Sequence, residues 1–225
     1  MGAVFVLHGS YESPEGQYGL GFEPFADERG FIVVYPTMSD PKGANWAYTD
    51  DLPYMAALVE VLTKDFSVDP ALIFACGHSS GGSMSLFLQN EAKFLTAVGA
   101  VEAGVGHMDE WHMDERGIRT MVVWNHGDPV LAKYGGEELY RSTVSTLRRR
   151  GSQEPRSREA LPTSGRIVEA ELQTYADDEA PALVMLSFRS EPGTHAWLRH
   201  PNCTFDSTEQ LVRFFFDWPA QAWVI

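Results

Sequence analysis

A serine flanked by glycines stands at residues 77–81, Gly-His-Ser-Ser-Gly, between a predicted strand and a predicted helix. The apolar run before it has strand length, and a helix-length segment of small and apolar residues follows it. A serine at the tip of a sharp strand-to-helix turn has a strained backbone, so its neighbours two residues away must lack side chains. Gly77 and Gly81 meet that requirement. The pattern predicts that Ser79 is an exposed nucleophile beside a helix N-terminus, which favours developing negative charge.

A serine nucleophile of this kind needs an acid and then a histidine further along the chain. Asp128 follows a predicted strand, and His195 follows the last predicted strand. Both should lie at the carboxyl ends of their strands, where chemistry collects in α/β folds. We therefore predict a catalytic triad of Ser79, Asp128 and His195, with Asp109 and Asp114 as the alternative acids. An imidazole base with an unperturbed pKa would make activity rise with pH near about pH 6–7.

The oxyanion of a tetrahedral intermediate needs backbone N–H donors near the nucleophile. The expected donors are the N–H of Ser80, directly after the serine, and that of Ser10, in the loop after the first strand. Three tryptophans are candidate substrate-binding platforms for an aromatic or sugar ring: Trp197, Trp46 and Trp111. Core packing is nearly as good an interpretation of Trp46.

Residues 107–115 carry two histidines and several carboxylates, which raises the question of a metal site. His107 and His112 are five residues apart, and on a helix that spacing splays the two side chains. We therefore expect no metal and no other cofactor. The segment is better interpreted as a loop or short helix above the pocket.

Predicted strands alternate with predicted helices along the chain, which indicates an α/β fold with a mostly parallel sheet covered by helices on both faces. We expect one domain over residues 1–225, with a polar surface excursion at 151–165. The predicted strands are residues 3–7, 31–36, 72–76, 96–103, 118–124, 167–175 and 183–188, and the predicted helices lie near 24–28, 51–66, 80–90, 136–150 and 206–218.

The composition limits the classes of binding partner that are expected. Acidic residues outnumber basic ones, 31 against 17, and the net charge of −14 disfavours nucleic acid and anionic membranes while favouring a neutral substrate. Two cysteines make no disulfide framework, and no apolar run reaches transmembrane length. The beginning of the sequence does not have the pattern of a signal peptide. We expect a cytoplasmic protein as encoded, or a secreted one if the chain is a trimmed form, and a monomer or small homo-oligomer.

The motifs together resemble the α/β-hydrolase esterase group that contains feruloyl esterases, acetyl xylan esterases and polyhydroxyalkanoate depolymerases. Ser80 stands where that group often has Asn, and Thr194 replaces a frequent Gly before the histidine. Members usually carry N-terminal strands that this chain lacks, so a fold reduced at its N-terminus is expected. The matching stretches are residues 7–9, 26–36, 77–82, 128–130, 193–197 and 206–216.

The resemblance implies a serine carboxylic ester hydrolase that works through an acyl-enzyme on a small-molecule or polysaccharide-linked ester. A feruloyl or acetyl xylan esterase is the leading hypothesis, and a polyhydroxybutyrate depolymerase-like polyester hydrolase is the alternative. A non-catalytic binding module on the same fold would lack a member of the triad, and none is missing here. A serine peptidase usually carries an extra domain that restricts access, and 225 residues leave no room for one.

Overall fold

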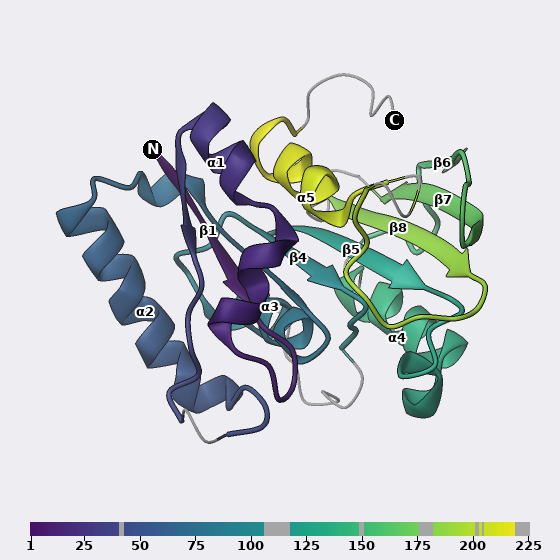
Figure 1. Cartoon of the computed structure of the whole chain (residues 1–225), viewed down its shortest axis with the longest axis horizontal. Coiled ribbons are helices and arrows are strands. Elements are labelled where there is room, and N and C mark those ends of the chain that lie inside the picture. Colours follow the sequence, from purple (N-terminus) through teal and green to yellow (C-terminus); the bar gives the residue numbers. More distant parts are fainter. Residues whose placement is uncertain are drawn as a thin grey trace.

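The computed structural model describes residues 1–40, 43–105, 118–148, 151–175, 182–200, 203 and 205–218. Within these residues eight strands form one sheet in the order β2-β1-β3-β4-β5-β8-β7-β6 (Figure 1). The strands are β1 (Gly2–Leu7), β2 (Phe31–Val34), β3 (Ile73–His78), β4 (Ala97–Val101), β5 (Arg119–Asn125), β6 (Ser157–Ala160), β7 (Ile167–Tyr175) and β8 (Leu183–Ser190). The helices are α1 (Glu23–Arg29), α2 (Tyr48–Asp65), α3 (Ser80–Glu91), α4 (Glu137–Leu147) and α5 (Ser207–Phe216).

The sheet is parallel from β2 to β8 and antiparallel at its far edge. β7 pairs antiparallel with β8, and β6 pairs antiparallel with β7. The predicted strands and the mostly parallel sheet are confirmed, but the interpretation of residues 151–165 as a mere surface excursion is wrong because β6 lies within them. All four residues of β6 are exposed, so the strand has no buried face and no alternation of apolar and polar side chains to reveal it.

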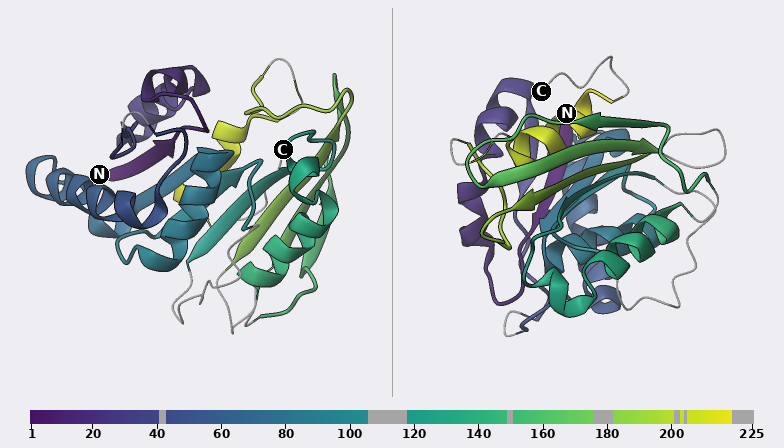
Figure 2. Two further views of the ribbon diagram at one scale, coloured as in Figure 1. Left: turned by 90° about the horizontal axis from the view of Figure 1, so that it is seen from below. Right: turned by 90° about the vertical axis from the view of Figure 1, so that its right-hand side faces the viewer.

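Helices cover both faces of the sheet, as the alternation of strands and helices predicted (Figure 2). Successive side chains of a buried strand point to opposite faces. In β1, Val4 and Val6 therefore pack on the same face as α5, whereas Ala3, Phe5 and Leu7 join the core beneath α2 and α3. A third cluster lies between α4 and the strands β4, β5 and β8.

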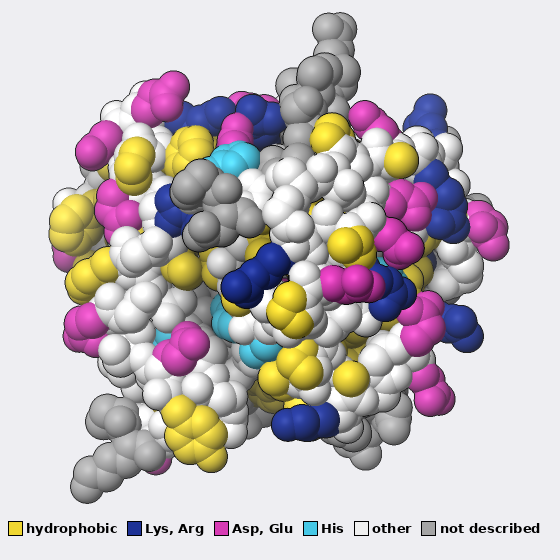
Figure 3. Space-filling view, turned by 45° about the vertical axis from the view of Figure 1, so that its right-hand side comes forward, with side chains coloured by type: hydrophobic (Ala, Val, Ile, Leu, Met, Phe, Trp, Pro, Cys, Tyr) yellow, Lys and Arg dark blue, Asp and Glu magenta, His cyan; other side chains and the backbone are white. Residues whose placement is uncertain are grey.

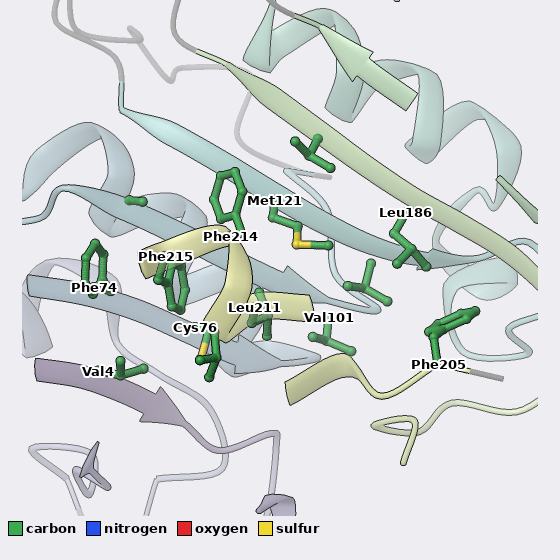
Figure 4. Packing of buried hydrophobic residues seen from close by; sticks show 14 of the residues in the cluster. Val4, Phe74, Cys76, Val101, Met121, Leu186, Phe205, Leu211, Phe214 and Phe215 are labelled. Carbon is green, nitrogen blue, oxygen red and sulfur yellow. The ribbon is translucent and has the colours of Figure 1, made fainter. Parts of the chain in front are cut away.

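Helix α5 is the main cover of its face. Its Leu211, Phe214 and Phe215 are buried over the central strands, where they meet Phe74 of β3 and Leu186 of β8 among others (Figure 4). The helix begins at the predicted boundary near residue 206, where the Asp206 carboxylate accepts hydrogen bonds from the N–H groups of Thr208 and Glu209. Among the described residues, none of the helices is both long and apolar enough to span a membrane.

Candidate active site

Ser79 occupies the strained turn between β3 and α3 that the glycine spacing predicted. Its backbone has φ 53° and ψ −119°, a conformation that residues other than glycine rarely adopt. Its N–H donates to the Val101 carbonyl of β4 at 3.0 Å, which ties the turn to the neighbouring strand. A Cβ on Gly77 would collide with the backbone of Gly81, and a Cβ on Gly81 would collide with the Leu7 carbonyl oxygen. The turn therefore depends on a close approach of three backbone segments.

His195 and Asp128 are brought together from loops after β8 and β5. His195 Nδ1 lies 2.6 Å from Asp128 Oδ2. The other oxygen of the Asp128 carboxylate accepts hydrogen bonds from the N–H groups of Val130 at 2.7 Å and Leu131 at 3.0 Å. Because these bonds fix the carboxylate, the acid is held in place before it meets the histidine. The alternative acids Asp109 and Asp114 lie outside the described residues.

Ser79 and His195 line the same cavity, of about 370 Å³. His195 Nε2 is buried and has no hydrogen-bond partner among the described residues. Since Nδ1–H donates a hydrogen bond to the Asp128 carboxylate, the neutral ring presents a free lone pair at Nε2. That nitrogen is therefore the one available to a serine hydroxyl. The cavity is lined by Ser10, Asn45, Trp46, Tyr48, Ser79, Ser80, Ser83, Glu102, Ala103, Gly104, Val130, Leu131, Tyr134, Leu139 and His195.

A second carboxylate, that of Glu102 directly after β4, also reaches the histidine. Its side chain is completely buried, and its Oε2 lies 3.2 Å from His195 Nδ1 and 3.6 Å from His78 Nε2. The same oxygen accepts a hydrogen bond from the Ala196 N–H at 2.5 Å. Glu102 was not among the site residues predicted from the sequence. An acid at the carboxyl end of an otherwise apolar strand was the signal that could have indicated it.

The two carboxylates set the ionisation of the histidine. Burial lowers the pKa of His195, but hydrogen bonds to Asp128 and Glu102 and their negative charges outweigh it and raise the pKa to about 9. For Asp128, burial raises the pKa, whereas the bonds from His195 and from the Leu131 and Val130 N–H groups bring it below its ordinary value. The raised pKa moves the expected titration of the base above the pH 6–7 range of an unperturbed imidazole.

The candidate oxyanion donors lie at the same cavity. Ser80 is the first residue of α3, so its N–H has no acceptor within the helix. In the loop after β1, the Gly9 N–H donates to Glu12, the Tyr11 N–H to Ala44 and the Glu12 N–H to Gly9. Within the described part of the chain, the N–H of Ser10 has no such acceptor, which agrees with its expected place as a loop donor. The Ser10 side chain donates to Asn45 Oδ1, which braces the loop at the cavity wall.

The tryptophans proposed as platforms have different surroundings. Trp46 is 4% exposed, its Nε1 donates to the His8 carbonyl at 2.8 Å, and its ring packs against the His8 ring, so it is mainly a core residue with an edge at the cavity. Trp197 is half-buried and lines a separate hollow of about 640 Å³ on the other side of the histidine. Its Nε1 donates to Thr208 Oγ1 at 2.9 Å, which fixes the ring. Trp111 lies outside the described residues.

The structure brings together a different candidate metal cluster from the one that the sequence suggested. His107 and His112 lie outside the described residues. Within the described part of the chain, a metal-sized cluster is formed by His78, Glu102 and His195, whose ligand atoms lie within 4.8 Å of one another. The Glu102 oxygen and the His195 Nδ1 are already engaged in hydrogen bonds, so we interpret the group as an acid–histidine network. The expectation of no metal stays a prediction.

Histidine side chains reach the surface near the middle of one face of the molecule, beside hydrophobic side chains and a basic one (Figure 3). Acidic and basic side chains are interspersed over the described part of that face (Figure 3). Despite the net charge of −14, the acidic side chains therefore do not form a single patch on the described part of this face (Figure 3).

No family model matches the chain. Over 95 residues, 37% of the chain, it is 35% identical to an acetylxylan esterase of Coprinopsis cinerea. Over 114 residues, 46% of the chain, it is 25% identical to feruloyl esterase B of Neurospora crassa. These alignments cover 25% and 39% of the two proteins, so the chain spans well under half the length of the curated relatives it matches.

The whole fold has a counterpart among solved structures. The acetyl xylan esterase from Aspergillus awamori superimposes with a TM-score of 0.70 at 16% identity, covering 95% of this chain and 88% of that one. This likeness shows that the chain has the α/β-hydrolase fold. The predicted fold class and the resemblance to acetyl xylan and feruloyl esterases are thereby confirmed. The resemblance to polyhydroxyalkanoate depolymerases stays a prediction.

Proposed function

We propose that this protein is a serine carboxylic ester hydrolase that works through an acyl-enzyme with Ser79, His195 and Asp128. The proposal is supported mainly by the arrangement of the serine, the histidine and the carboxylate. A serine in a strained turn at a helix N-terminus shares a cavity with a histidine whose Nδ1 is held 2.6 Å from a carboxylate. This combination of nucleophile, base and orienting acid is the one that acyl transfer requires.

In the first half of the reaction, Ser79 Oγ attacks the ester carbonyl carbon while His195 Nε2 takes the hydroxyl proton. The carbonyl oxygen becomes an oxyanion, which the N–H groups of Ser80 and Ser10 stabilise. His195 then gives the proton to the leaving alcohol oxygen as the bond from the carbonyl carbon to that oxygen breaks. Ser79 is left as an acyl ester, and Asp128 stabilises the imidazolium that forms on the way.

In the second half, a water molecule takes the place of the alcohol. His195 Nε2 removes a proton from that water as its oxygen attacks the acyl carbon, and the same oxyanion donors act again. The bond from the acyl carbon to Ser79 Oγ breaks, the proton returns to the serine and a carboxylic acid leaves. Each step uses groups of residues that line the cavity or contact a residue lining it.

The proposed substrate is a neutral ester of a sugar hydroxyl with an acetyl or feruloyl group. Two observations support this class. The chain is similar to proteins named acetylxylan esterase and feruloyl esterase B over 95 and 114 residues. A cavity of about 370 Å³ also has the size of a small-molecule site, roughly 300–1,000 Å³, and an acyl group of either kind fits such a volume.

A hydrolysis panel tests the proposal. The purified chain is assayed on 4-nitrophenyl acetate, acetylated xylan, methyl ferulate and a short polyhydroxybutyrate oligomer. We expect turnover of the acetyl and feruloyl esters, and loss of about 10⁵-fold or more in kcat for Ser79→Ala, since no other group can form the acyl intermediate. Turnover of the oligomer alone would instead make the chain a polyester hydrolase.

Ser157→Ala is the matched control for that variant. Ser157 is an exposed serine on the antiparallel edge of the sheet, and it does not line the cavity. Its replacement should leave every rate in the panel unchanged. Equal activity of Ser79→Ala and Ser157→Ala would refute the proposed mechanism.

A further inference from the structure

We propose that Glu102 is a second carboxylate of the catalytic histidine: a positioning residue that shares the Nδ1–H of His195 with Asp128 and holds the loop that carries the ring. The inference rests on the proposed function, because it assigns Glu102 a task through His195 as the base. It adds a fourth, buried member to the serine, histidine and aspartate proposed above.

The contacts of Glu102 involve both the ring and the backbone of the histidine loop. Oε2 lies 3.2 Å from His195 Nδ1, within reach of a bifurcated hydrogen bond whose stronger branch goes to Asp128 at 2.6 Å. The same oxygen accepts from the Ala196 N–H at 2.5 Å. One carboxylate oxygen therefore fixes the ring and the peptide that follows it. These two contacts limit how far the imidazole can rotate or move away from the serine.

Holding Glu102 in this position costs free energy. Its side chain is completely buried, its Oε1 has no hydrogen-bond partner among the described residues, and its φ is 48°. A buried charge is costly unless it is paired, and a left-handed backbone at a residue with a long side chain is strained. Strained residues persist where the surrounding structure imposes them and cluster at functional sites. Ser79 is strained in the same way, 53° in φ, on the neighbouring strand end.

The ionisable groups around His195 come from several elements, and two of them reach Nδ1. Those two are Asp128 and Glu102, and their combined effect on the histidine is described above. The others lie beside the ring, in the hollow beyond it or across the cavity. Among the described residues the set is Asp128 after β5, Glu102 after β4, His78 at the end of β3, Tyr11 and Glu12 in the loop after β1, and Tyr48 and Tyr134 across the cavity.

A second acceptor at Nδ1 has two consequences. It keeps the proton on Nδ1, and so keeps the lone pair on Nε2, even when Asp128 cannot accept. It also stabilises the imidazolium more than one carboxylate would, which delays the appearance of the neutral base until higher pH. The first consequence protects the rate against loss of Asp128, and the second sets the pH range.

The pH dependence of Glu102→Gln tests the second consequence. The amide can still accept from the Ala196 N–H through its oxygen, but the charge beside His195 is gone. An opposite charge at this distance moves a pKa by about one unit or more, so the acid limb of kcat/KM should move to lower pH by that amount. At pH 7, kcat/KM as a fraction of its high-pH plateau should therefore be about tenfold larger than in wild type, while the plateau itself falls. A residue that only supports the fold would lower the rate at every pH.

Glu137→Gln is the control. Glu137 is an exposed carboxylate 3.1 Å from His126 Nδ1, so the change removes an acid–histidine pair that does not line the cavity. Its pH profile should match that of wild type. An unchanged acid limb in Glu102→Gln, with the rate reduced equally at all pH values, would overturn the proposal.

Asp128→Asn tests the first consequence without altering Glu102. In a triad with one acid, this change costs about 10⁴-fold because the histidine adopts the wrong tautomer. With Glu102 still at Nδ1 we expect a loss of about 10–100-fold, and about 10⁴-fold only in the double variant Asp128→Asn with Glu102→Gln. A full 10⁴-fold loss in Asp128→Asn alone would show that Glu102 does not serve the histidine. This arm remains decisive if Glu102→Gln fails to fold.

An NMR titration separates failure of this inference from failure of the proposed function. The His195 ring signals are followed with pH in Ser79→Ala, with and without Glu102→Gln, and are assigned by their loss in His195→Gln. This readout needs no ester turnover. We expect the His195 pKa to fall by about one unit or more when the Glu102 charge is removed. An unmoved pKa overturns the role of Glu102, whereas absence of ester hydrolysis with a moved pKa overturns only the proposed activity.

Discussion

The two sides of the site are built in different ways. The nucleophile side is one continuous stretch in which β3 turns into α3, and it is held by backbone atoms that nearly touch. The acid side is assembled from residues that follow β4, β5 and β8, and it is held by hydrogen bonds between charged and polar groups. The first depends on the absence of side chains and the second on their charges. Substitutions on the two sides should therefore impair the protein in different ways.

Gly81→Ala should cause the larger loss, because it adds bulk where backbone segments meet. The new Cβ would collide with the carbonyl oxygens of Leu7 and His8, and backbone cannot yield as a flexible side chain can. We expect destabilisation of about 3 kcal/mol or more and a drop in kcat/KM of at least about 10²-fold through misplacement of Ser79. Thermal unfolding and ester kinetics measure the two effects.

Gly16→Ala is the matched control on the nucleophile side. A Cβ at Gly16 meets nothing within 4 Å, so the same substitution adds a methyl group to open space. Its melting temperature and rates should equal those of wild type. Similar behaviour of the two alanine variants would show that the close approach at Gly81 does not hold the turn.

The carboxylates of the acid side should determine the pH dependence of kcat/KM in the unmodified protein. The base must be neutral, and the pKa of His195 is raised to about 9, so kcat/KM should climb with pH through about 9 and level off above it. At pH 7 the rate should be about 10²-fold below the plateau, since about 1% of the imidazole is neutral there. The profile is measured with an acetyl ester after subtraction of hydroxide-driven hydrolysis. A plateau already reached at pH 7 would contradict the acid network.

Trp197→Ala should have the smallest effect, because the residue lies beyond the histidine in the neighbouring hollow. A stacked ring contributes about 1 kcal/mol, and only a substrate with an aromatic or sugar ring can use it. We expect turnover of methyl ferulate to fall about fivefold relative to 4-nitrophenyl acetate. The acetyl ester is the internal control. Equal losses on both esters would mean that Trp197 packs the fold and does not select the substrate.

The contrast between the two sides also explains what the sequence could predict. The turn at Ser79 is local, so glycine spacing and the strand and helix patterns around it were enough. Asp128 and His195 were chosen from their order and from their places after predicted strands, and the structure places their side chains 2.6 Å apart. The last helix is also a local pattern, and it begins at Ser207, close to the predicted start at residue 206.

Glu102 and the pKa of His195 could not be predicted in the same way. The contact between Glu102 and His195 joins residues 93 positions apart, and its existence depends on the register of β4 and on the path of the loop after β8. Without that contact, an ordinary imidazole was the natural expectation. The edge strand β6 was missed for a related reason: its exposed polar residues pair with β7 through backbone bonds, which leave no hydrophobic pattern.

The central claim is that Ser79 is the acylated nucleophile, and covalent labelling tests it most directly. The chain is incubated with a serine-reactive fluorophosphonate at pH 9, and the adduct is measured by intact mass and located by peptide mapping. We predict one adduct per chain, on Ser79, formed in step with the loss of esterase activity and absent from Ser79→Ala. Labelling of a different serine, or loss of activity without an adduct on Ser79, would contradict the account.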